Sequence, residues 1–377
     1  MDTSDSEAQR YANNSNLQQE VDGLAQPLIE HGQTPGLVLG VLLANGESRF
    51  YSYGVADKTT NQPMNPDTLF DIGSLSKGFL GVITAQLVDE GVLSWDTTVA
   101  ELLPPDVPLS ADARKITVQQ LATHTSGLPR QPFTLQTLSY FMEYLFTGNN
   151  FYRHFDREFT LNYLAGFEAP SKVEPAYSNI GYGLLGYLVE RRTGKTLETL
   201  LSEKIIQPLG MARTGYDLEH VTGVLNRAYG YAGDQPKFIP RGSAVPDWQF
   251  TELMKGSSAM YSNARDLLAF AKAYMDKPSS MEPALEDTLR IRIPRAKEAA
   301  AIAWVEDDIN QQHIAYQIGL VAGYTSFIGL DTRHHQAIVV LQNSFNWSAN
   351  IGYQLLVRLG SAQDIRQRLA LAQGHVP

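Results

Sequence analysis

The sequence of 377 residues predicts an α+β fold: one sheet built from both ends of the chain, with a mostly helical segment inserted between them. Short apolar runs typical of strands occur near the N-terminus, and runs of the same kind return in the last third of the chain. From about residue 78 to residue 273, apolar residues follow helical spacing between Pro/Gly-rich connections. The strand-like runs are residues 37–43, 48–53, 314–318, 325–330 and 337–342.

Local patterns justify the N-terminal elements. Residues 1–16 are polar and rich in Asn and Ser, so we expect a flexible lead-in. A helix is predicted from Gln18 to His31 because apolar residues recur on one face, although Pro27 lies inside it. Asn45-Gly46 separates the first two strand-like runs and is typical of a tight hairpin turn, because both turn residues must accept positive φ.

The C-terminal third shows the same pattern of strand-like apolar runs separated by turns. Gly319, Gly323 and the polar turn Asp331–Arg333 separate the three strand-like runs, and a final amphipathic helix is predicted from near Ile351. We expect a single domain over residues 17–377. Its α/β part is predicted at about 17–77 and 255–377, and its helical part at about 78–254.

Composition narrows the functional classes. Thirty Lys and Arg stand against 40 Asp and Glu, a net charge of −10, which argues against a nucleic-acid partner or attachment to anionic lipid. The chain has no cysteine, so thiol catalysis, disulfides and thiolate metal sites are excluded. No apolar run is long enough for a membrane span, and the N-terminus is not a signal peptide. A periplasmic or secreted location, with the leader already removed, is slightly favoured over a cytoplasmic one, and the oligomeric state is left open.

The segment Gly73-Ser74-Leu75-Ser76-Lys77 contains a Ser-x-x-Lys motif. Residues three apart on a helix share a face, so the Lys77 amine can reach the Ser74 hydroxyl. Near the start of a helix, the dipole and the free N–H groups favour developing negative charge. A serine is a weak nucleophile unless a base lies beside it, and an unprotonated lysine can be that base. A capping serine followed by a surface lysine would have the same pattern.

Tyr-x-Asn occurs three times, and Tyr177-Ser178-Asn179 is the copy that we associate with Ser74. It follows Pro175, precedes a helix-like segment, and lies about a hundred residues after Ser74, enough chain to fold back over the nucleophile. A tyrosine beside a cationic lysine can be partly deprotonated and can pass a proton to the leaving group.

Other motifs are decoys or are absent. Gly181-Tyr182-Gly183-Leu184-Leu185-Gly186 fits a dinucleotide fingerprint, but no strand-like run precedes it, so we expect glycines that allow close helix packing. The sequence holds neither His-Glu-x-x-His nor Gly-x-Ser-x-Gly. His334-His335 is predicted in a turn with both side chains in solvent. Neither a metal nor an organic cofactor is implied.

These motifs together resemble the serine β-lactamase and penicillin-binding-protein superfamily, in its class C-like branch, which also includes family VIII esterases and D,D-peptidases. The resemblance runs from about Gln33 to Asn343. It implies a β-lactamase/transpeptidase-like fold with an antiparallel sheet flanked by helices and an inserted helical subdomain. The similar stretches are Phe70–Lys77, Ile116–Pro129, Tyr177–Tyr182, Pro208–Met211, and Gly256–Ser262 followed by Arg265–Leu267.

The resemblance also implies roles for particular residues. Ser74 would be the acylated nucleophile, with Lys77 and Tyr177 as its general-base pair, and Asn179 would contact Lys77 and the substrate. The family's Lys/His-x-Gly motif falls on Gln317-Ile318-Gly319. The backbone N–H groups of Ser74 and Leu320 would form the oxyanion hole, and His124 is expected to be structural.

Gln317 departs from the family pattern, because a cation at that position usually helps to hold a substrate carboxylate. A neutral amide donates a weaker hydrogen bond, so the expected substrates shift toward uncharged small-molecule esters or amides. The sequence therefore predicts a serine hydrolase with an acyl-enzyme at Ser74, with a carboxylesterase favoured. A D-amino-acid peptidase or D,D-carboxypeptidase, a weak β-lactamase, an acyltransferase, and a sensor or scaffold without turnover stay open.

Substrate specificity is predicted to depend on two aromatic-rich segments, 131–155 and 229–250. Their aromatic side chains are expected either to form an apolar pocket wall or to fill the helical core, and the sequence leaves both explanations open.

Overall fold

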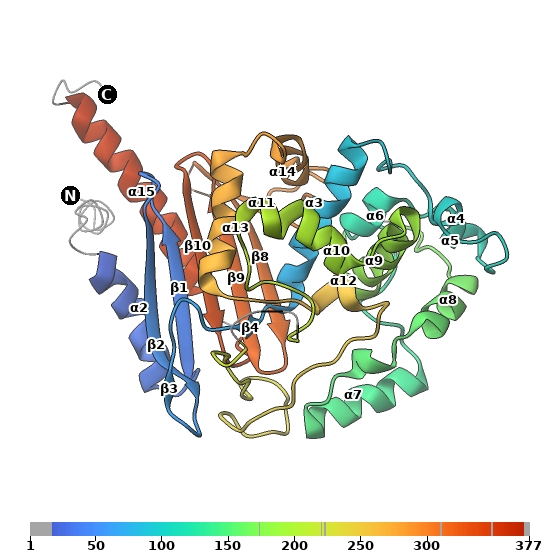
Figure 1. The fold of residues 1–377 in the computed structure, drawn as a ribbon, viewed down its shortest axis with the longest axis horizontal. Helices are drawn as coiled ribbons and strands as arrows, with labels where there is room; N and C mark the ends of the chain where they lie inside the picture. Colours follow the sequence, from blue (N-terminus) through green and yellow to red (C-terminus); the bar gives the residue numbers. More distant parts are fainter. Residues whose placement is uncertain are drawn as a thin grey trace.

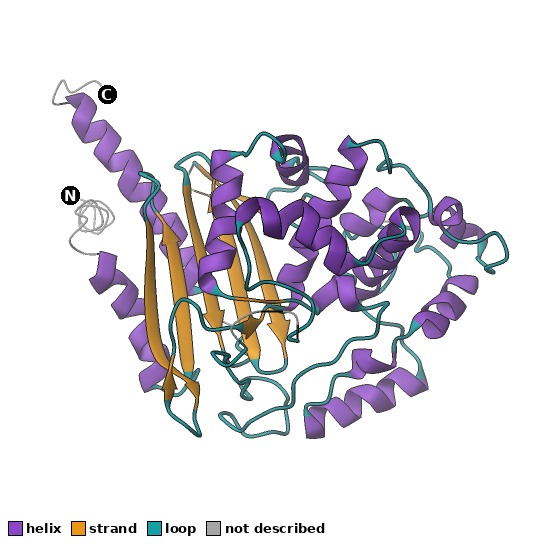
Figure 2. Ribbon diagram, in the orientation of Figure 1, coloured by secondary structure: helices purple, strands orange, loops and turns teal. Residues whose placement is uncertain are grey.

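An antiparallel sheet of eight strands organises the molecule (Figures 1 and 2). The computed structural model describes residues 17–172, 174–219, 221, 224–309, 311–347 and 350–372, so the predicted lead-in at 1–16 lies outside the described residues. The strand order is β3-β2-β1-β10-β9-β8-β7-β6, and the pairing of β1 with β10 joins the two ends of the chain. The strands are β1 (Gly36–Leu42), β2 (Ser48–Asp57), β3 (Gln62–Pro63), β6 (Ala299–Ala300), β7 (Val305–Ile309), β8 (Gln312–Val321), β9 (Tyr324–Asp331) and β10 (Gln336–Gln342).

Both faces of the sheet are covered, which explains why β1, β9 and β10 are buried at every position. Successive side chains of a strand point to opposite faces. In β1, Leu39 packs toward helices α2 (Leu17–Glu30) and α15 (Ile351–Ala372), whereas Val38 belongs to the larger core on the other face. Helix α13 (Ala264–Asp276) packs on that second face against β1 and β10.

The helical region lies beside the sheet on the face that carries α13 (Figure 1). Helix α3 (Ser76–Asp89) is almost entirely buried and packs against α14 (Glu282–Leu289), so it forms the centre of this region. Strand β4 (Phe70–Asp71) comes shortly before α3 in the chain and pairs with β5 (Tyr261–Ser262) in a short two-stranded sheet. The other helices are α4 (Val99–Leu102), α5 (Ala111–Lys115), α6 (Val118–Ala122), α7 (Leu135–Thr147), α8 (Arg157–Ala165), α9 (Asn179–Thr193), α10 (Leu197–Leu201), α11 (Gln207–Leu209) and α12 (Lys255–Ser258), with single turns at Gly73–Leu75, Phe151–His154 and Ser202–Ile206.

Most expected elements are confirmed. The predicted helix from Gln18 to His31 is α2, which accommodates Pro27 in its last turn, and the Asn45-Gly46 hairpin joins β1 to β2 with Gly46 at φ +85°. Strand β7 was not predicted, because its sequence Val-Glu-Asp-Asp-Ile is acidic rather than apolar. Its pairing with β8 therefore comes from the sheet and not from local propensity.

The prediction that both side chains of His334-His335 lie in solvent is wrong for His334. Its ring is buried between two carboxylates: Nδ1 lies 2.7 Å from Asp331 Oδ2, and Nε2 lies 2.8 Å from Asp364 Oδ1 on α15. His335 is exposed, as expected. Asp364 lies thirty residues along the chain from His334, so no local pattern indicated this contact.

The glycine-rich stretch 181–186 lies inside α9, and an N-cap at Ser178, not a strand, precedes it. A Cβ atom at Gly183 would lie 2.8 Å from the Leu253 carbonyl oxygen, and one at Gly186 would lie 3.2 Å from the Gly256 Cα. The close-packing interpretation of these glycines is therefore confirmed. Within the described part of the chain, no helix combines the length and the apolar character needed to cross a bilayer.

Candidate active site

Ser74 lies in a tight turn between β4 and α3. Gly73 has φ +51°, a conformation that side chains disfavour, and the turn Gly73–Leu75 leads directly into α3. Two side chains hold the turn: Asp71 Oδ1 accepts the Gly73 N–H at 2.9 Å, and the Ser76 hydroxyl donates to the Gly73 carbonyl at 2.6 Å. Ser74 thus lies near the start of α3, as expected, but two positions before the first α-helical residue.

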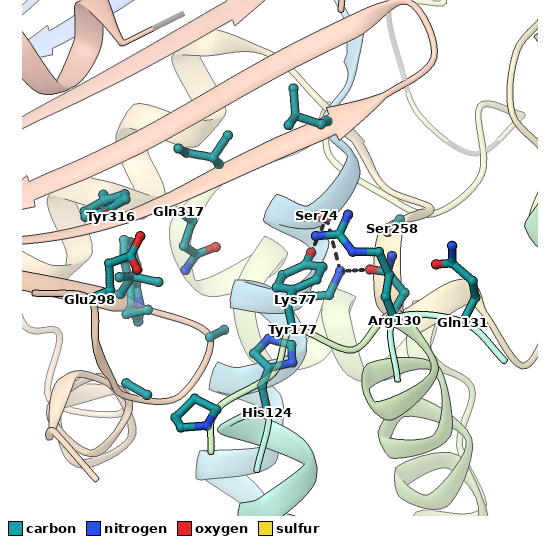
Figure 3. A pocket seen from close by; sticks show the side chains of 18 of the residues that line it. Ser74, Lys77, His124, Arg130, Gln131, Tyr177, Ser258, Glu298, Tyr316 and Gln317 are labelled. Carbon is teal, nitrogen blue, oxygen red and sulfur yellow. Dashed lines mark hydrogen bonds between the residues drawn. The ribbon is translucent and has the colours of Figure 1, made fainter. Parts of the chain in front are cut away.

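Lys77 is buried one turn further on and points back at Ser74 (Figure 3). Its Nζ lies 3.1 Å from Ser74 Oγ, and it donates to Asn179 Oδ1 at 2.8 Å and to the Ser257 carbonyl at 3.0 Å. Burial, and then the positive charge of Arg130, hold the pKa of the Lys77 amine well below its usual 10.5. A neutral amine has two N–H groups for these two acceptors and a lone pair left for Ser74.

Tyr177 lies in the loop directly before α9, and its side chain contacts Ser74. Its hydroxyl donates to Ser74 Oγ at 2.5 Å, although 103 positions separate the two residues. Burial raises the pKa of Tyr177 to about 12, even though the hydrogen bond with Ser74 and the charge of Arg130 lower it. A pKa raised in this way favours the neutral phenol near pH 7 over the partly deprotonated tyrosine that the sequence suggested.

His124 supports the Tyr177 segment without touching Ser74 among the contacts described. It has φ +59°, and its Nδ1 accepts the Ser178 N–H at 2.9 Å. The ring lies 4.7 Å from the Tyr177 ring and 5.1 Å from the Tyr182 ring, centroid to centroid. Burial, followed by the charges of Lys77 and Arg130, lowers the pKa of His124 to about 3. A neutral ring that orients Tyr177 agrees with the expected structural role.

Asn179 connects Lys77 to the aromatic side of the site. Its Oδ1 accepts from Lys77, and its Nδ2 donates to the Tyr152 hydroxyl at 2.5 Å. The Tyr152 hydroxyl donates in turn to Gln131 Oε1 at 3.2 Å. Asn179 is the first residue of α9, whose N-cap Ser178 accepts the Gly181 N–H, so the start of the helix fixes its position.

Strand β8 brings the remaining predicted residues to the same pocket. Gly319 allows a close approach to the Ser74 turn, because a Cβ there would lie 2.4 Å from the Ile72 carbonyl oxygen. The Leu320 backbone nitrogen lies 3.5 Å from the position that a Gly73 Cβ would occupy. Gln317 is buried against Gly78 and lines the pocket, and within the described part of the chain its Nε2 has no hydrogen-bond partner.

All the predicted site residues except Gly319 line one cavity of about 670 Å³, and Gly319 lies beside it between Ile318 and Leu320, which do line it. Aromatic side chains from both predicted segments form part of the wall, and they also pack on one another, as Tyr144 does on Phe151 and Trp248 at 5.7 Å. These aromatic residues therefore both form the pocket wall and fill the helical core, the two explanations that the sequence left open. The aromatic wall residues from these segments are Phe141, Tyr144, Phe151, Tyr152 and Trp248.

The sequence analysis assigned no role to three groups that contact the site residues: the Ser257 carbonyl, the Tyr152 hydroxyl and the Arg130 guanidinium. Ser257 and Tyr152 lay in segments that the sequence singled out, but nothing in the spacing connects them to Lys77 or Asn179. Arg130 follows the Gly-Leu-Pro turn and carries no motif of its own. Among the described residues, no group of three or more His, Cys, Asp and Glu side chains is arranged to hold a metal ion.

Comparison with known proteins agrees with this geometry. The Beta-lactamase family model matches residues 21–359. The chain therefore belongs to this family, within the serine β-lactamase and penicillin-binding-protein superfamily of hydrolases, and its β-lactamase/transpeptidase-like fold is confirmed.

Among the relatives, an unguisins hydrolase from Aspergillus campestris (strain IBT 28561) is 27% identical over 363 residues, which cover 90% of this chain and 64% of that protein. A β-lactamase from Psychrobacter immobilis is 30% identical over 235 residues, 62% of this chain and 54% of the relative. The chain thus spans less than two thirds of the length of these relatives. A class C β-lactamase in complex with cefoxitin superposes with a TM-score of 0.77 at 22% identity, covering 92% of this chain and 99% of the other.

Proposed function

We propose that the protein is a serine hydrolase that forms an acyl-enzyme at Ser74 and acts on carboxylic esters. The observation that carries the proposal is the contact of Ser74 Oγ with two groups, the Lys77 amine at 3.1 Å and the Tyr177 hydroxyl at 2.5 Å. A serine hydroxyl between a buried neutral amine and a phenol has both a base for its proton and an acid for the leaving group.

In this proposal, Lys77 accepts the Ser74 proton as Ser74 Oγ attacks the ester carbonyl carbon. The N–H groups of Ser74 and Leu320 donate to the resulting oxyanion. Tyr177 donates its proton to the departing alkoxide and recovers one from the Lys77 ammonium, so the pair returns to its starting state. A water molecule then attacks the acyl-enzyme, gives its proton to the same pair, and releases the acid and Ser74.

Gln317 supports esters over β-lactams. At this point of the pocket wall, the side chain offers a neutral N–H donor and no positive charge. A charged partner makes a hydrogen bond roughly twice as strong as a neutral one, so a carboxylate next to Gln317 gains less here than beside a cation. The β-lactamase name of a relative keeps β-lactam hydrolysis as an alternative for the test, and peptide hydrolysis stays as the alternative that the sequence left open.

The test is a hydrolysis panel of para-nitrophenyl esters with short and long acyl chains, nitrocefin and D-alanyl dipeptides. We expect esters to be the best substrates. Ser74→Ala is expected to abolish turnover, and Ser258→Ala, which removes another pocket serine, should keep most of it. Mass spectrometry after fluorophosphonate treatment should place one adduct on Ser74.

Other results would reject the proposal in distinct ways. Faster turnover of nitrocefin or D-alanyl dipeptides would favour a β-lactamase or a peptidase. An adduct on Ser74 without steady-state turnover of any substrate would favour a sensor or scaffold. An adduct on a different side chain would reject Ser74 as the nucleophile.

A further inference from the structure

Arg130 lines the pocket beside the proposed catalytic residues, and its function is not explained by the mechanism above. Its guanidinium carbon lies 4.7 Å from the centre of the Tyr177 ring, and Figure 3 shows the side chain next to Ser74 and Tyr177. The residue is exposed. In the part of the chain that the structure describes, its guanidinium forms no ion pair and no hydrogen bond, so its donors face the pocket unused.

The backbone around Arg130 is held by residues of the site itself. The Ser178 hydroxyl donates to the Pro129 carbonyl at 2.7 Å, and the Tyr152 hydroxyl donates to the Gln131 side chain at 3.2 Å. Gly127, at the start of this loop, has φ +84° and packs against Pro170 so closely that a Cβ would lie 2.6 Å from the Pro170 ring. These contacts hold the backbone on either side of Arg130 in place before any ligand binds.

The charge of the pocket contrasts with that of the whole chain. The chain carries −10, yet among the described residues the cavity is lined by two arginines, Arg130 and Arg295, and a single acid, Glu298, besides the Lys77 amine, whose neutral form burial favours. Arg295 donates to the Glu298 carbonyl, and these two residues stay close together. The positive charge of Arg130 lowers the pKa of both Lys77 and Tyr177, and among the described residues no carboxylate forms an ion pair with it.

We propose that Arg130 is an anion subsite that binds a carboxylate on the leaving group of the substrate. The inference rests on the proposed function, in which Tyr177 protonates the leaving group and must therefore lie against it. Because Arg130 stacks on the Tyr177 ring, its guanidinium reaches the same part of the substrate, where it can donate two parallel N–H bonds to a carboxylate. Gln317 lies on the other side of Ser74 (Figure 3), so the positive charge missing there is present on the opposite wall.

The test compares two esters that differ only in a carboxylate on the leaving group, meta-(butanoyloxy)benzoate and phenyl butanoate. We expect Arg130→Gln to lower kcat/KM for the first by about tenfold to a hundredfold and for the second by less than about threefold. Arg130→Lys should restore part of the loss. Arg157→Gln removes an exposed arginine that lies over the Tyr187 ring outside the pocket and should change neither value.

Two results would overturn the subsite. An equal loss with both esters would mean that Arg130 acts only through the charge of the reacting groups, and no loss with either would mean that it does not bind the carboxylate. A carboxylate on the acyl part, as in para-nitrophenyl hydrogen glutarate against para-nitrophenyl pentanoate, should show no dependence on Arg130.

A binding measurement separates this inference from the proposed function. Calorimetry on Ser74→Ala, with and without Arg130→Gln, compares the affinities for the same two butanoate esters without any turnover. Tighter binding of the carboxylate ester that disappears in the double variant would establish the subsite even if the wild type hydrolysed neither ester. Equal affinities would reject the subsite even if Ser74 proved to be the nucleophile.

Discussion

At the scale of single residues, the protonation state of Lys77 decides which group can remove the Ser74 proton in the proposed mechanism. The Asn179 side chain and the Ser257 carbonyl accept its N–H groups, and burial disfavours the charged form. Tyr177, with a pKa raised to about 12, keeps its proton over the range in which Lys77 loses its own. In the proposed mechanism, the two neighbours of Ser74 therefore have different roles, base and acid, at the same pH.

The first prediction concerns the pH dependence of ester hydrolysis. We expect kcat/KM to rise with pH as Lys77 is deprotonated, with a midpoint well below 10.5. Arg130→Gln should move this midpoint to higher pH, because removing a nearby cation stabilises the Lys77 ammonium. Initial rates with phenyl butanoate across the pH range measure both effects. A midpoint at the ordinary lysine value would contradict the neutral-amine mechanism.

The second prediction concerns Asp71, the buried carboxyl that holds the Gly73 N–H. Burial raises its pKa to about 7, the charge of Asp247 adds to this, and the Gly73 N–H and Arg227 oppose it. Because the folded state holds the protonated carboxyl, its stability is complete only below the carboxyl pKa of the unfolded chain. This stability is lost as the pH rises from there toward the folded pKa of about 7. The gap from 3.8 corresponds to at most about 4 kcal/mol.

Asp71→Asn keeps an acceptor for Gly73 and removes the titration. The wild type should lose stability as the pH rises, whereas the variant should not. The free energy of unfolding of the variant minus that of the wild type should therefore increase by about 2–3 kcal/mol from about pH 5 to about pH 8. Urea denaturation of both proteins at the two pH values measures this. A difference that does not change with pH would show that Asp71 titrates normally in the folded protein.

At the scale of elements, the start and the packing of α9 place Asn179 in the site. The Ser178 N-cap sets where the helix begins, and glycines on one side let it approach the segment before α12. Local sequence predicted the glycines correctly as packing residues. It did not predict β7, whose acidic sequence becomes a strand only because β8 offers a partner edge.

The third prediction tests this close packing. Gly183→Ala should lower the free energy of unfolding by about 2 kcal/mol, because the new methyl group would meet the Leu253 carbonyl oxygen at 2.8 Å. Gly23→Ala in α2 is a matched control, since nothing lies within 4 Å of its Cβ position. The control should be stabilised by about 1 kcal/mol, because alanine favours the helix. Thermal or urea unfolding measures both, and a neutral Gly183→Ala would contradict the packing argument.

At the scale of the whole molecule, the sheet separates two helical layers, and only one of them contains the candidate site. Helices α2 and α15 cover one face, and the helical region with the site covers the other. The β9–β10 turn reaches α15 through His334, whose two ring nitrogens lie between Asp331 and Asp364. Both partners accept hydrogen bonds, so the ring donates from both nitrogens as an imidazolium.

The fourth prediction concerns this contact. Burial alone would lower the pKa of His334, but the hydrogen bonds with Asp364 and Asp331 raise it. The stability it contributes is therefore complete below the unfolded histidine pKa and is lost as the pH rises through the folded value. His334→Asn should loosen α15 and lower the free energy of unfolding by about 1–3 kcal/mol.

Hydrogen exchange of residues 351–372 measures the loosening of α15. Protection factors, which correct for the intrinsic pH dependence of exchange, should fall in His334→Asn at neutral pH and in the wild type only as the pH rises through the raised pKa of His334. His335→Asn changes the exposed neighbouring residue, which has φ +53°, a conformation that asparagine tolerates, and should leave exchange unchanged. Equal acceleration in both variants would mean that the turn, not the buried ring, holds the helix.

The sequence by itself determined the elements whose causes are local: the strands of the two ends, the Asn45-Gly46 hairpin, and the three-residue spacing that brings Lys77 of α3 to Ser74 in the preceding turn. The resemblance predicted the pairing of Ser74 with Tyr177, because the motif carries information that no local pattern does. Tertiary structure alone decided which protonation state each group adopts, since burial and the charge of Arg130 set the pKa of Lys77 and of Tyr177. It also decided the His334 contact and the position of Arg130, whose guanidinium has no ion-pair partner among the described residues, because contacts between distant parts of the chain leave no trace in residue spacing.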